Sequence, residues 1–252
     1  MPGSITVTPA ELLIIVALFI VARLVLHMQP IKARSQGRSP VFAREYLDPF
    51  IFAGIAAFLL ITFVARTYYI PSGSMEPTLK IGDVLLVNKF EYRFVKPREG
   101  DIVVFRPPVP SPDDFIKRVI GLPGDTLKIQ NGTVYIDGKA LAEPYVAAKP
   151  DYNLIVKNYD VYVDERDGTG YQPLDPSVAN IPPKKDWTAP NRIPKNCYFM
   201  MGDNRNDSED SHIWGFAQLS GTFATGQRAG GPAHFTGRAF LIFWPLSHAR
   251  IL

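Results

Sequence analysis

Two long apolar segments occupy the first quarter of the chain, and short alternating segments occupy the rest. The first apolar segment, 12–26, contains one charge, at Arg23, and the second, 49–65, contains none. Because about 20 apolar residues cross a bilayer as a helix, we predict two transmembrane helices, one within 1–27 and one over 49–66. A cleavable signal peptide is the alternative for the first segment, but no Lys or Arg precedes Arg23 to form a basic leading region.

Basic residues near these segments predict the orientation of the chain. The connecting loop, 28–48, contains Lys32, Arg34, Arg38 and Arg44, whereas the first ten residues contain no Lys or Arg. Since short loops rich in Lys and Arg stay in the cytoplasm, we expect 28–48 to be cytoplasmic and 67–252 to be extracytoplasmic. The alternative is that this loop is a solvated linker, with basic residues that only fix topology and contact anionic lipid.

Residues after position 81 follow the pattern of strands rather than that of helices. Short β-branched or aromatic runs bounded by Gly, Pro and Asp lie near 85–87, 101–105, 115–120, 126–129, 133–136, 197–201 and 239–244. Asn131-Gly132 separates two of these runs and is a strong signal for a hairpin turn. The 23 prolines argue against long helices in this part. The pattern predicts a mainly β domain over 67–252.

One stretch of this domain has a weaker pattern. Residues 142–194 are polar, rich in proline and without sustained alternation. We interpret them as a variable subdomain or insertion.

Composition excludes several classes of function. Lys and Arg total 27 against 24 acids, a net charge of +3, and no dense basic cluster indicates a nucleic-acid surface. Cys197 is the single cysteine, so an intramolecular disulfide cannot form. The sequence has no His-Glu-x-x-His motif, and its four histidines stand in no recognisable Ser-His-Asp context. We therefore expect no nucleic-acid partner, no metal and no other cofactor.

A serine and a lysine are the candidate catalytic residues. Ser74 lies in a Pro-Ser-Gly-Ser run, shortly after the second apolar segment. Lys117 lies in the predicted strand 114–121, where alternation places it on one face with Phe115 and Val119. Apolar surroundings lower the pKa of a lysine toward the range in which it can accept a proton. Considered singly, Ser74 has a simpler interpretation as a turn residue, and Lys117 has one as a solvated residue.

Four ordered motifs stand out across the domain. They are Pro-Ser-Gly-Ser-Met-Glu-Pro-Thr-Leu at 71–79, Lys-Arg-Val-Ile-Gly-Leu-Pro-Gly-Asp at 117–125, Gly-Asp-Asn-Arg-Asn-Asp-Ser at 202–208 and Gly-Arg-Ala at 237–239. Together they resemble the signature boxes of type I signal peptidases in the bacterial two-helix form. The resemblance implies a multi-pass protein of the inner membrane, with a catalytic domain on the periplasmic side, that removes N-terminal signal peptides from secreted precursors.

The resemblance also implies catalytic roles at matched positions. Ser74 would be the nucleophile, and Lys117 the neutral general base that activates first the serine and then a water. Ser72 would complete an oxyanion hole with the backbone N–H of Ser74. Ser208 would orient the lysine through a hydrogen bond. The residues that would brace this loop are Asp203, Arg205 and Asp210.

Substrate binding is implied by the same resemblance. The positions that would line shallow pockets for the −1 and −3 residues of a signal peptide are Tyr68, Ile70, Pro71, Met75, Leu79, Phe115 and Ile116. Small pockets select Ala-x-Ala by excluding bulky side chains. An extended peptide would add as a strand beside the segment near Asp114. The implied partners are precursors that carry signal peptides, membrane lipid and, indirectly, the secretion translocon.

The chain departs from the family pattern in and after the third motif. Asn206-Asp207 stands where Asp-Asn is usual, and His212 stands where an Arg commonly pairs with Asp210. Residues 219–233 are an insertion rich in Gly, Thr and Ala, and we expect a mobile surface loop there.

Two other readings remain open. A self-processing Ser-Lys protein would share the residue pair and the β-rich scaffold, although the two apolar segments do not fit that class. A catalytically silent, membrane-anchored binding module would leave Ser74 and Lys117 as a turn residue and a packing residue.

Overall fold

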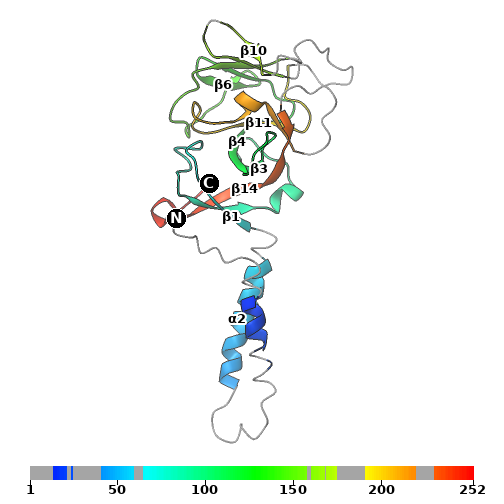
Figure 1. The fold of residues 1–252 in the computed structure, drawn as a ribbon, viewed down its shortest axis with the longest axis vertical. Helices are drawn as coiled ribbons and strands as arrows, with labels where there is room; N and C mark the ends of the chain where they lie inside the picture. Colours follow the sequence, from blue (N-terminus) through cyan, green and yellow to red (C-terminus); the bar gives the residue numbers. More distant parts are fainter. Residues whose placement is uncertain are drawn as a thin grey trace, which may run out of the picture. The chain divides into compact units, whose positions relative to one another are not determined.

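The computed structural model describes residues 14–21, 24, 41–59, 65–157, 160–167, 169–174, 191–219 and 230–252. The chain forms two units, residues 1–66 and 67–252, and each is described by itself (Figure 1). Most of the described residues of the first unit are helical, and nearly all of the regular structure described in the second unit is β-strand, which confirms the prediction of a mainly β fold.

The N-terminal unit contains helical residues 14–21 and 24, and helix α2 (Val41–Leu59). Helix α2 begins at Val41 rather than at Pro49, so it includes part of the segment expected as a loop and contains Pro49 in its interior. Its first half contains Arg44, Glu45 and Asp48. Four ranges lie outside the described residues: 1–13 and 22–23 in the predicted first helix, 25–40 at its end and in the predicted loop, and 60–64 in the second apolar segment. Among the described residues, no helix combines the length and apolar character needed to cross a membrane.

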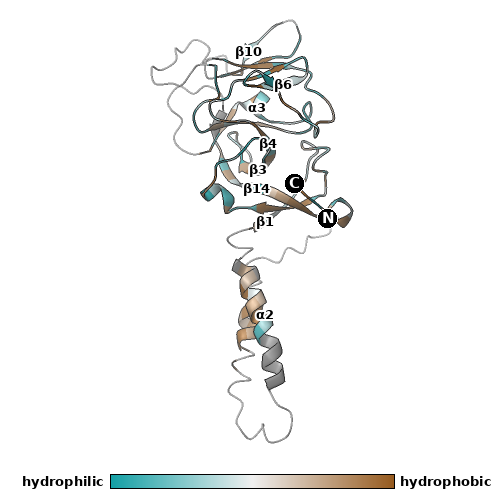
Figure 2. Cartoon of the chain, turned by 180° about the vertical axis from the view of Figure 1, so that it is seen from behind, coloured by the Kyte–Doolittle hydropathy of each residue, from teal (hydrophilic) through white to brown (hydrophobic). Residues whose placement is uncertain are grey.

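The first sheet has the strand order β1-β2-β14-β3-β4-β11-β12-β13, and β15 pairs with β14. Its strands are β1 (Ala65–Tyr69), β2 (Val84–Asn88), β3 (Ile102–Arg106), β4 (Phe115–Gly121), β11 (Cys197–Met201), β12 (Phe216–Gln218), β13 (Gly230–Pro232), β14 (His234–Trp244) and β15 (Arg250–Ile251). The long strand β14 pairs antiparallel with both β2 and β3, and β4 lies between β3 and β11. Figure 2 shows hydrophobic colour along much of β14, as its central position requires.

The second sheet has the strand order β10-β9-β8-β5-β6-β7. Its strands are β5 (Leu127–Gln130), β6 (Thr133–Ile136), β7 (Lys139–Ala140), β8 (Asn153–Lys157), β9 (Asp160–Asp164) and β10 (Gln172–Pro173). The predicted hairpin is confirmed: β5 and β6 pair around Asn131 and Gly132, whose φ angles of 51° and 74° suit a tight two-residue turn. Strands β8 to β10 lie in the weakly patterned stretch and pair within this sheet.

A shared hydrophobic core joins the two sheets. Ile120 and Phe199 from the first sheet pack with Ile129 and Leu154 from the second, and Cys197 is buried among them. Figure 1 shows β10 and β1 at opposite ends of this domain, with β4 and β11 between them. The second sheet is therefore fixed against the strands that hold the motif residues.

Helices are short in this domain, as the prolines predict. Those described after residue 81 are η3 (Glu91–Arg93), α3 (Ser211–Trp214) and η5 (Leu246–His248). Part of the expected surface loop is ordered as a strand, because β13 pairs in parallel with β12. Residues 220–229 of that loop lie outside the described residues.

Candidate active site

Ser74 lies in a compact turn between β1 and β2. The backbone N–H of Glu76 donates to the carbonyl of Gly73 at 3.0 Å, and that of Leu79 donates to the carbonyl of Met75 at 2.9 Å. Met75 and Leu79 are buried in the core beneath the turn. The turn is thus held by buried apolar side chains, while Ser74 stays partly accessible.

Lys117 lies in the middle of β4, between two neighbouring strands, so its backbone is firmly positioned. Its Nζ atom and the Oγ atom of Ser74 are hydrogen-bonded at 2.8 Å. The residue is 4% exposed, and its amine lies 5.6 Å from the centre of the Phe115 ring. Two residues that are 43 positions apart in the sequence are therefore in hydrogen-bond contact.

The pKa of Lys117 is lowered from its ordinary value. Burial is the main cause, because desolvation disfavours the ammonium form. Negative charges act in the opposite direction, and the residues that supply them are Asp210, Glu209, Asp203 and Asp207. The desolvation effect dominates, which favours a neutral amine beside the serine hydroxyl.

The segment 202–210, which we call the catalytic loop, is tied directly to the serine turn. The backbone N–H of Asn204 donates to the carbonyl of Ser74 at 3.1 Å, and its side-chain amide donates to the carbonyl of Gly73 at 3.2 Å. Gly202 packs so closely that a Cβ atom there would collide with Ser208 and with the Ser74 carbonyl. Only glycine fits at this position.

Asp203 binds an arginine from β4. Nε of Arg118 donates to Oδ1 at 2.8 Å and Nη2 donates to Oδ2 at 2.7 Å, a bidentate pair that is almost fully buried. The guanidinium also lies 3.9 Å from the ring centre of Tyr145. Arg118 follows Lys117 and points to the opposite side of β4, so one strand positions both Lys117 and the arginine that anchors the catalytic loop.

Asp210 organises the end of the catalytic loop. Its carboxylate accepts hydrogen bonds from the backbone N–H of Gly202 at 2.8 Å and from that of His212 at 3.1 Å, and it caps the short helix α3. The His212 Nδ1 atom lies 2.7 Å from the same carboxylate. Burial would raise the pKa of Asp210, but the hydrogen bonds from His212 and Gly202 and the charges nearby hold it below its usual value.

Arg205 is the largest fully buried side chain of the domain's described part. Its Nη2 donates to Oε1 of Glu143 at 2.5 Å and its Nη1 donates to Oε2 at 3.2 Å, while Nε donates to the carbonyl of Gly202 at 3.0 Å. The carboxylate that binds Arg205 thus lies in the stretch 142–194, and its guanidinium binds the start of the catalytic loop.

The two other predicted catalytic serines occupy different environments. Ser72 is exposed at the rim of the site. Ser208 is 8% exposed, and its Oγ makes no hydrogen bond with any residue that the structure describes. The expected hydrogen bond from Ser208 to Lys117 is therefore not formed here.

A cavity of about 360 Å³ opens at the Ser74 hydroxyl. Its lining includes Ile70, Pro71, Ser72, Gly73, Ser74, Met75, Ser111, Asp113, Asp114, Phe115, Ile116, Lys117, Asp207 and Glu209. Five of the seven predicted substrate-binding residues thus lie on its wall. Leu79 is instead fully buried in the core, and the Tyr68 hydroxyl donates to Asp114 at 3.0 Å.

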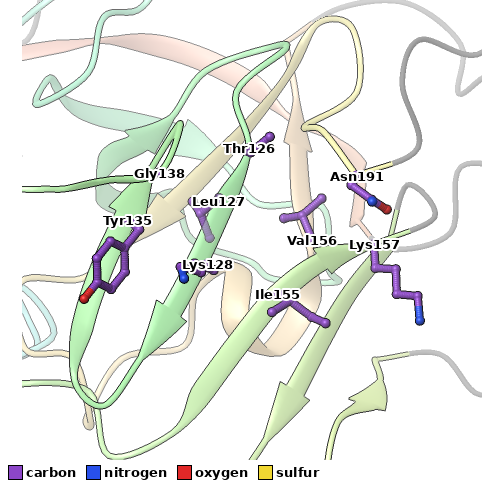
Figure 3. A pocket seen from close by; sticks show the side chains of 9 residues that line it. All are labelled: Thr126, Leu127, Lys128, Tyr135, Gly138, Ile155, Val156, Lys157 and Asn191. Carbon is purple, nitrogen blue, oxygen red and sulfur yellow. The ribbon is translucent and has the colours of Figure 1, made fainter.

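A second cavity, of about 320 Å³, lies on the second sheet (Figure 3). Lys128, Tyr135, Ile155 and Lys157 are among its lining residues, and no predicted site residue is. Among the described residues, no group of His, Cys, Asp and Glu side chains is arranged to hold a metal ion.

Sequence reasoning named Ser74 and Lys117 and the acids of the catalytic loop, but assigned no role to Arg118, Asn204 or Glu143. Arg118 and Asn204 stand inside recognised motifs, so their positions were a usable signal. Glu143 stands outside these motifs, and no local pattern connects it to Arg205, 62 positions away.

Comparison with known proteins identifies a family and several relatives. The family described as signal peptidase, peptidase S26, matches residues 43–229. Probable signal peptidase I-2 of Synechocystis sp. is 38% identical over 205 residues, which cover 79% of this chain and 72% of that protein. Signal peptidase I of Leptolyngbya laminosa is 34% identical over 226 residues, which cover 87% of each. A crystal structure of a signal peptidase I from Enterococcus faecalis V583 is 28% identical, covers 54% of this chain and 94% of that chain, and gives a TM-score of 0.31.

The chain therefore belongs to the signal peptidase family, peptidase S26, and is a peptidase of the signal peptidase I type.

Proposed function

We propose that this enzyme removes N-terminal signal peptides from secreted precursor proteins by serine catalysis, with Ser74 as the nucleophile and Lys117 as the general base. The observation that carries the proposal is the 2.8 Å hydrogen bond between the Ser74 hydroxyl and a lysine amine that is 4% exposed. A serine hydroxyl is a weak nucleophile until a neighbouring base takes its proton. A desolvated lysine can be that base, because its pKa is lowered.

In the acylation step, neutral Lys117 accepts the proton of the Ser74 hydroxyl while Oγ attacks the scissile carbonyl carbon. The carbonyl oxygen becomes an oxyanion, which the Ser74 backbone N–H and the Ser72 hydroxyl would stabilise. Collapse of the tetrahedral intermediate breaks the C–N bond, and the new amine takes the proton from Lys117. The mature protein leaves, and the signal peptide stays as an ester on Ser74.

In the deacylation step, Lys117 takes a proton from a water that attacks the ester, and the proton then returns to the Ser74 oxygen. The catalytic loop supports both steps by binding the carbonyls of Gly73 and Ser74 through Asn204. Two acids of the same loop, Asp207 and Glu209, act electrostatically on the lysine.

The substrate would bind as an extended strand between Pro71 and the start of β4. Ile70, Met75, Phe115 and Ile116 give the cavity an apolar wall, and such a wall accepts a small side chain without a charged partner. We propose that the cavity selects small residues at −1 and −3, as in Ala-x-Ala, through the exclusion of larger ones.

We further propose attachment to a membrane through the two apolar segments, with the domain 67–252 on the outer side and lipid as a direct partner.

An exposed patch after β2 supports contact with lipid. The rings of Phe90 and Phe94 are 44% and 74% exposed and lie 4.8 Å apart. Aromatic rings with surrounding cations are typical of surfaces that meet anionic headgroups. The basic residues of this patch are Lys89, Arg93, Lys96 and Arg98. Through the substrate's signal peptide, the translocon would be an indirect partner.

Cleavage of a precursor tests this function directly. Wild type, Ser74→Ala and Lys117→Ala would be compared in detergent with a precursor that has Ala-x-Ala before its cleavage point. We expect wild type to cut after the second Ala and both variants to lose cleavage while keeping the wild-type melting temperature within a few degrees. Cleavage by either variant at the wild-type rate would refute the assignment of the pair.

The same assay separates the alternative functions. A self-processing protein would trim itself but leave the added precursor intact. A silent binding module would bind the precursor with equal affinity in all three proteins and cut it in none.

A further inference from the structure

The buried charge of Arg205 depends on one carboxylate. The Arg205 side chain is fully buried, and both of its terminal nitrogens bind the two oxygens of Glu143. A guanidinium cannot lose its proton at ordinary pH, so burial without a counter-charge is strongly unfavourable. Glu143 is therefore what allows Arg205 to stay inside, where its Nε holds the carbonyl of Gly202.

The segment that contains Glu143 makes further contacts with the catalytic loop. The side-chain amide of Asn206 donates to the carbonyl of Lys149 at 3.1 Å, and the backbone N–H of Asp151 donates back to Asn206 Oδ1 at 3.1 Å. The ring of Tyr152 stacks on His212 with centroids 4.5 Å apart and planes within 12°. The connection between β7 and β8 thus contacts the catalytic loop at Arg205 and Asn206, and it contacts α3 at His212.

Gly202 transmits this support to the reacting groups. Its carbonyl accepts from Arg205, its N–H donates to Asp210, and its Cα lies against Ser208 and the Ser74 carbonyl without room for a methyl group. In a contact this close, a shift of Gly202 must move Ser208 or Ser74. A displacement of about 1 Å at a catalytic group can cost on the order of 100-fold in rate.

We propose that Glu143 is a positioning residue for catalysis, which holds the catalytic loop against Ser74 and Lys117 through Arg205 and Gly202. The hydrogen bonds described for its carboxylate come from Arg205 and Tyr145 rather than from Ser74 or Lys117. The inference rests on the proposed roles of Ser74 and Lys117, and it gives the second sheet's connection a specific part in the reaction.

The proposal predicts a change in the pH profile. Loss of the Glu143 charge would release Arg205 toward solvent and loosen the catalytic loop, so water would reach Lys117. Desolvation is the main reason why the lysine pKa is low, so hydration would raise that pKa. Because the neutral amine is the active form, the rise of the rate with pH would then occur at higher pH. The main charges acting on Lys117 belong to Asp210, Glu209, Asp203 and Asp207, and Glu143 would act through the loop's position instead.

The test compares Glu143→Gln with a matched control, Glu91→Gln. Glu91 also pairs with an arginine, Arg238, at 3.1 Å, and its side chain is 22% exposed against 12% for Glu143, but it lies on η3 rather than at the catalytic loop. We expect Glu143→Gln to lower kcat by about 100-fold, to change KM much less, and to shift the acidic limb of kcat upward in pH. Glu91→Gln should lower thermal stability without moving that limb. An unshifted limb in folded Glu143→Gln would overturn the proposal.

A double variant covers the case in which Glu143→Gln does not fold. Glu143→Gln with Arg205→Met removes both buried charges, and such a neutral exchange is often well tolerated. We expect the double variant to fold, yet to keep the low kcat and the shifted limb, because the methionine side chain has no N–H group to donate to the Gly202 carbonyl. Wild-type kcat and pH profile in the folded double variant would also overturn the proposal. If Ser74→Ala is inactive while both Glu143 variants behave as wild type, only this inference fails; if Ser74→Ala remains active, the proposed function itself fails.

Discussion

Lys117 on β4 and Lys128 on β5 both occupy β-strands, but in opposite environments. Lys117 is 4% exposed, next to a serine hydroxyl and under the catalytic loop. Lys128 is exposed, contacts the amide oxygen of Gln130 at 3.2 Å and lies 4.7 Å from the Tyr135 ring centre. The first sheet is covered at its lysine by segments from elsewhere in the chain, whereas the second sheet faces solvent there.

The contrast shows what makes a strand lysine a candidate base. Alternation places each lysine on one face of its strand, and water is excluded from that face only when another element covers it. For Lys117 the cover is the catalytic loop, which is itself held by the connection from the second sheet. Under the proposed mechanism the two sheets would differ in role: the first contains Lys117, and a connection from the second binds the catalytic loop.

The largest expected effect comes from replacing each lysine by arginine. Lys117→Arg should lower kcat/KM by about 10³- to 10⁴-fold, because a guanidinium cannot act as a base near neutral pH. Lys128→Arg should keep wild-type activity within about twofold, as exposed substitutions commonly do. Initial rates with a purified precursor measure both. Equal losses in the two variants would show that the contrast between the lysines is not catalytic.

A smaller effect is expected from adding one methyl group at a glycine of each region. Gly202→Ala would collide with Ser208 and the Ser74 carbonyl, and we expect kcat to fall about 100-fold through displacement of the pair. Gly138→Ala has open space but a φ of +77°, so it should cost about 1 kcal/mol of stability and leave kcat unchanged. Kinetics and urea unfolding would be measured together. Normal kcat for Gly202→Ala would contradict the tight packing.

The two cavities provide a third comparison. Ile116→Trp would fill part of the cavity at Ser74 and should lower kcat/KM by about tenfold for a substrate with Ala at −1 and −3. Ile155→Trp would fill part of the cavity in Figure 3 and should leave kcat/KM unchanged. If the second substitution reduced cleavage as much as the first, the second cavity would have to be included in substrate binding.

The smallest effect concerns the dependence of stability on pH. Asp210 has a lowered pKa in the folded state, against the effect of burial, because His212 and Gly202 bind its carboxylate. A lowered folded pKa stabilises the protein above the unfolded value of about 3.9 and loses that contribution as the pH falls below it. The advantage of wild type over Asp210→Asn in urea unfolding should therefore shrink from pH 5 to pH 3.

Asp137 on the second sheet is the control for that measurement. Its pKa is also lowered, mainly by the backbone N–H of Thr126, so the sign is the same. The residue is solvent-exposed, and screening reduces the effect. Asp137→Asn should thus change the pH dependence less than Asp210→Asn does. The opposite order would mean that buried contacts do not decide acid stability here.

Local patterns anticipated a large part of the fold. The strand runs near 115–120, 133–136 and 197–201 became β4, β6 and β11, and Asn131-Gly132 became the expected turn. The stretch 142–194 was harder to read, because β8 and β9 are short and separated by polar connections. Their strand character depends on pairing with β5 and with each other, and pairing partners are not visible in a single run of sequence.

By itself, the sequence determined the strand-forming segments, the hairpin turn and the two residues proposed for catalysis, because alternation, turn chemistry and ordered motifs are local properties. Only the tertiary structure decided which buried charges meet: Arg118 with Asp203, and Arg205 with Glu143. A buried ion pair forms where folding brings opposite charges together away from solvent. The local sequence around such a residue does not distinguish it from the many acids and bases that stay on the surface. The position of Lys117 in its strand was therefore readable in advance, but the enclosure that lowers its pKa was not.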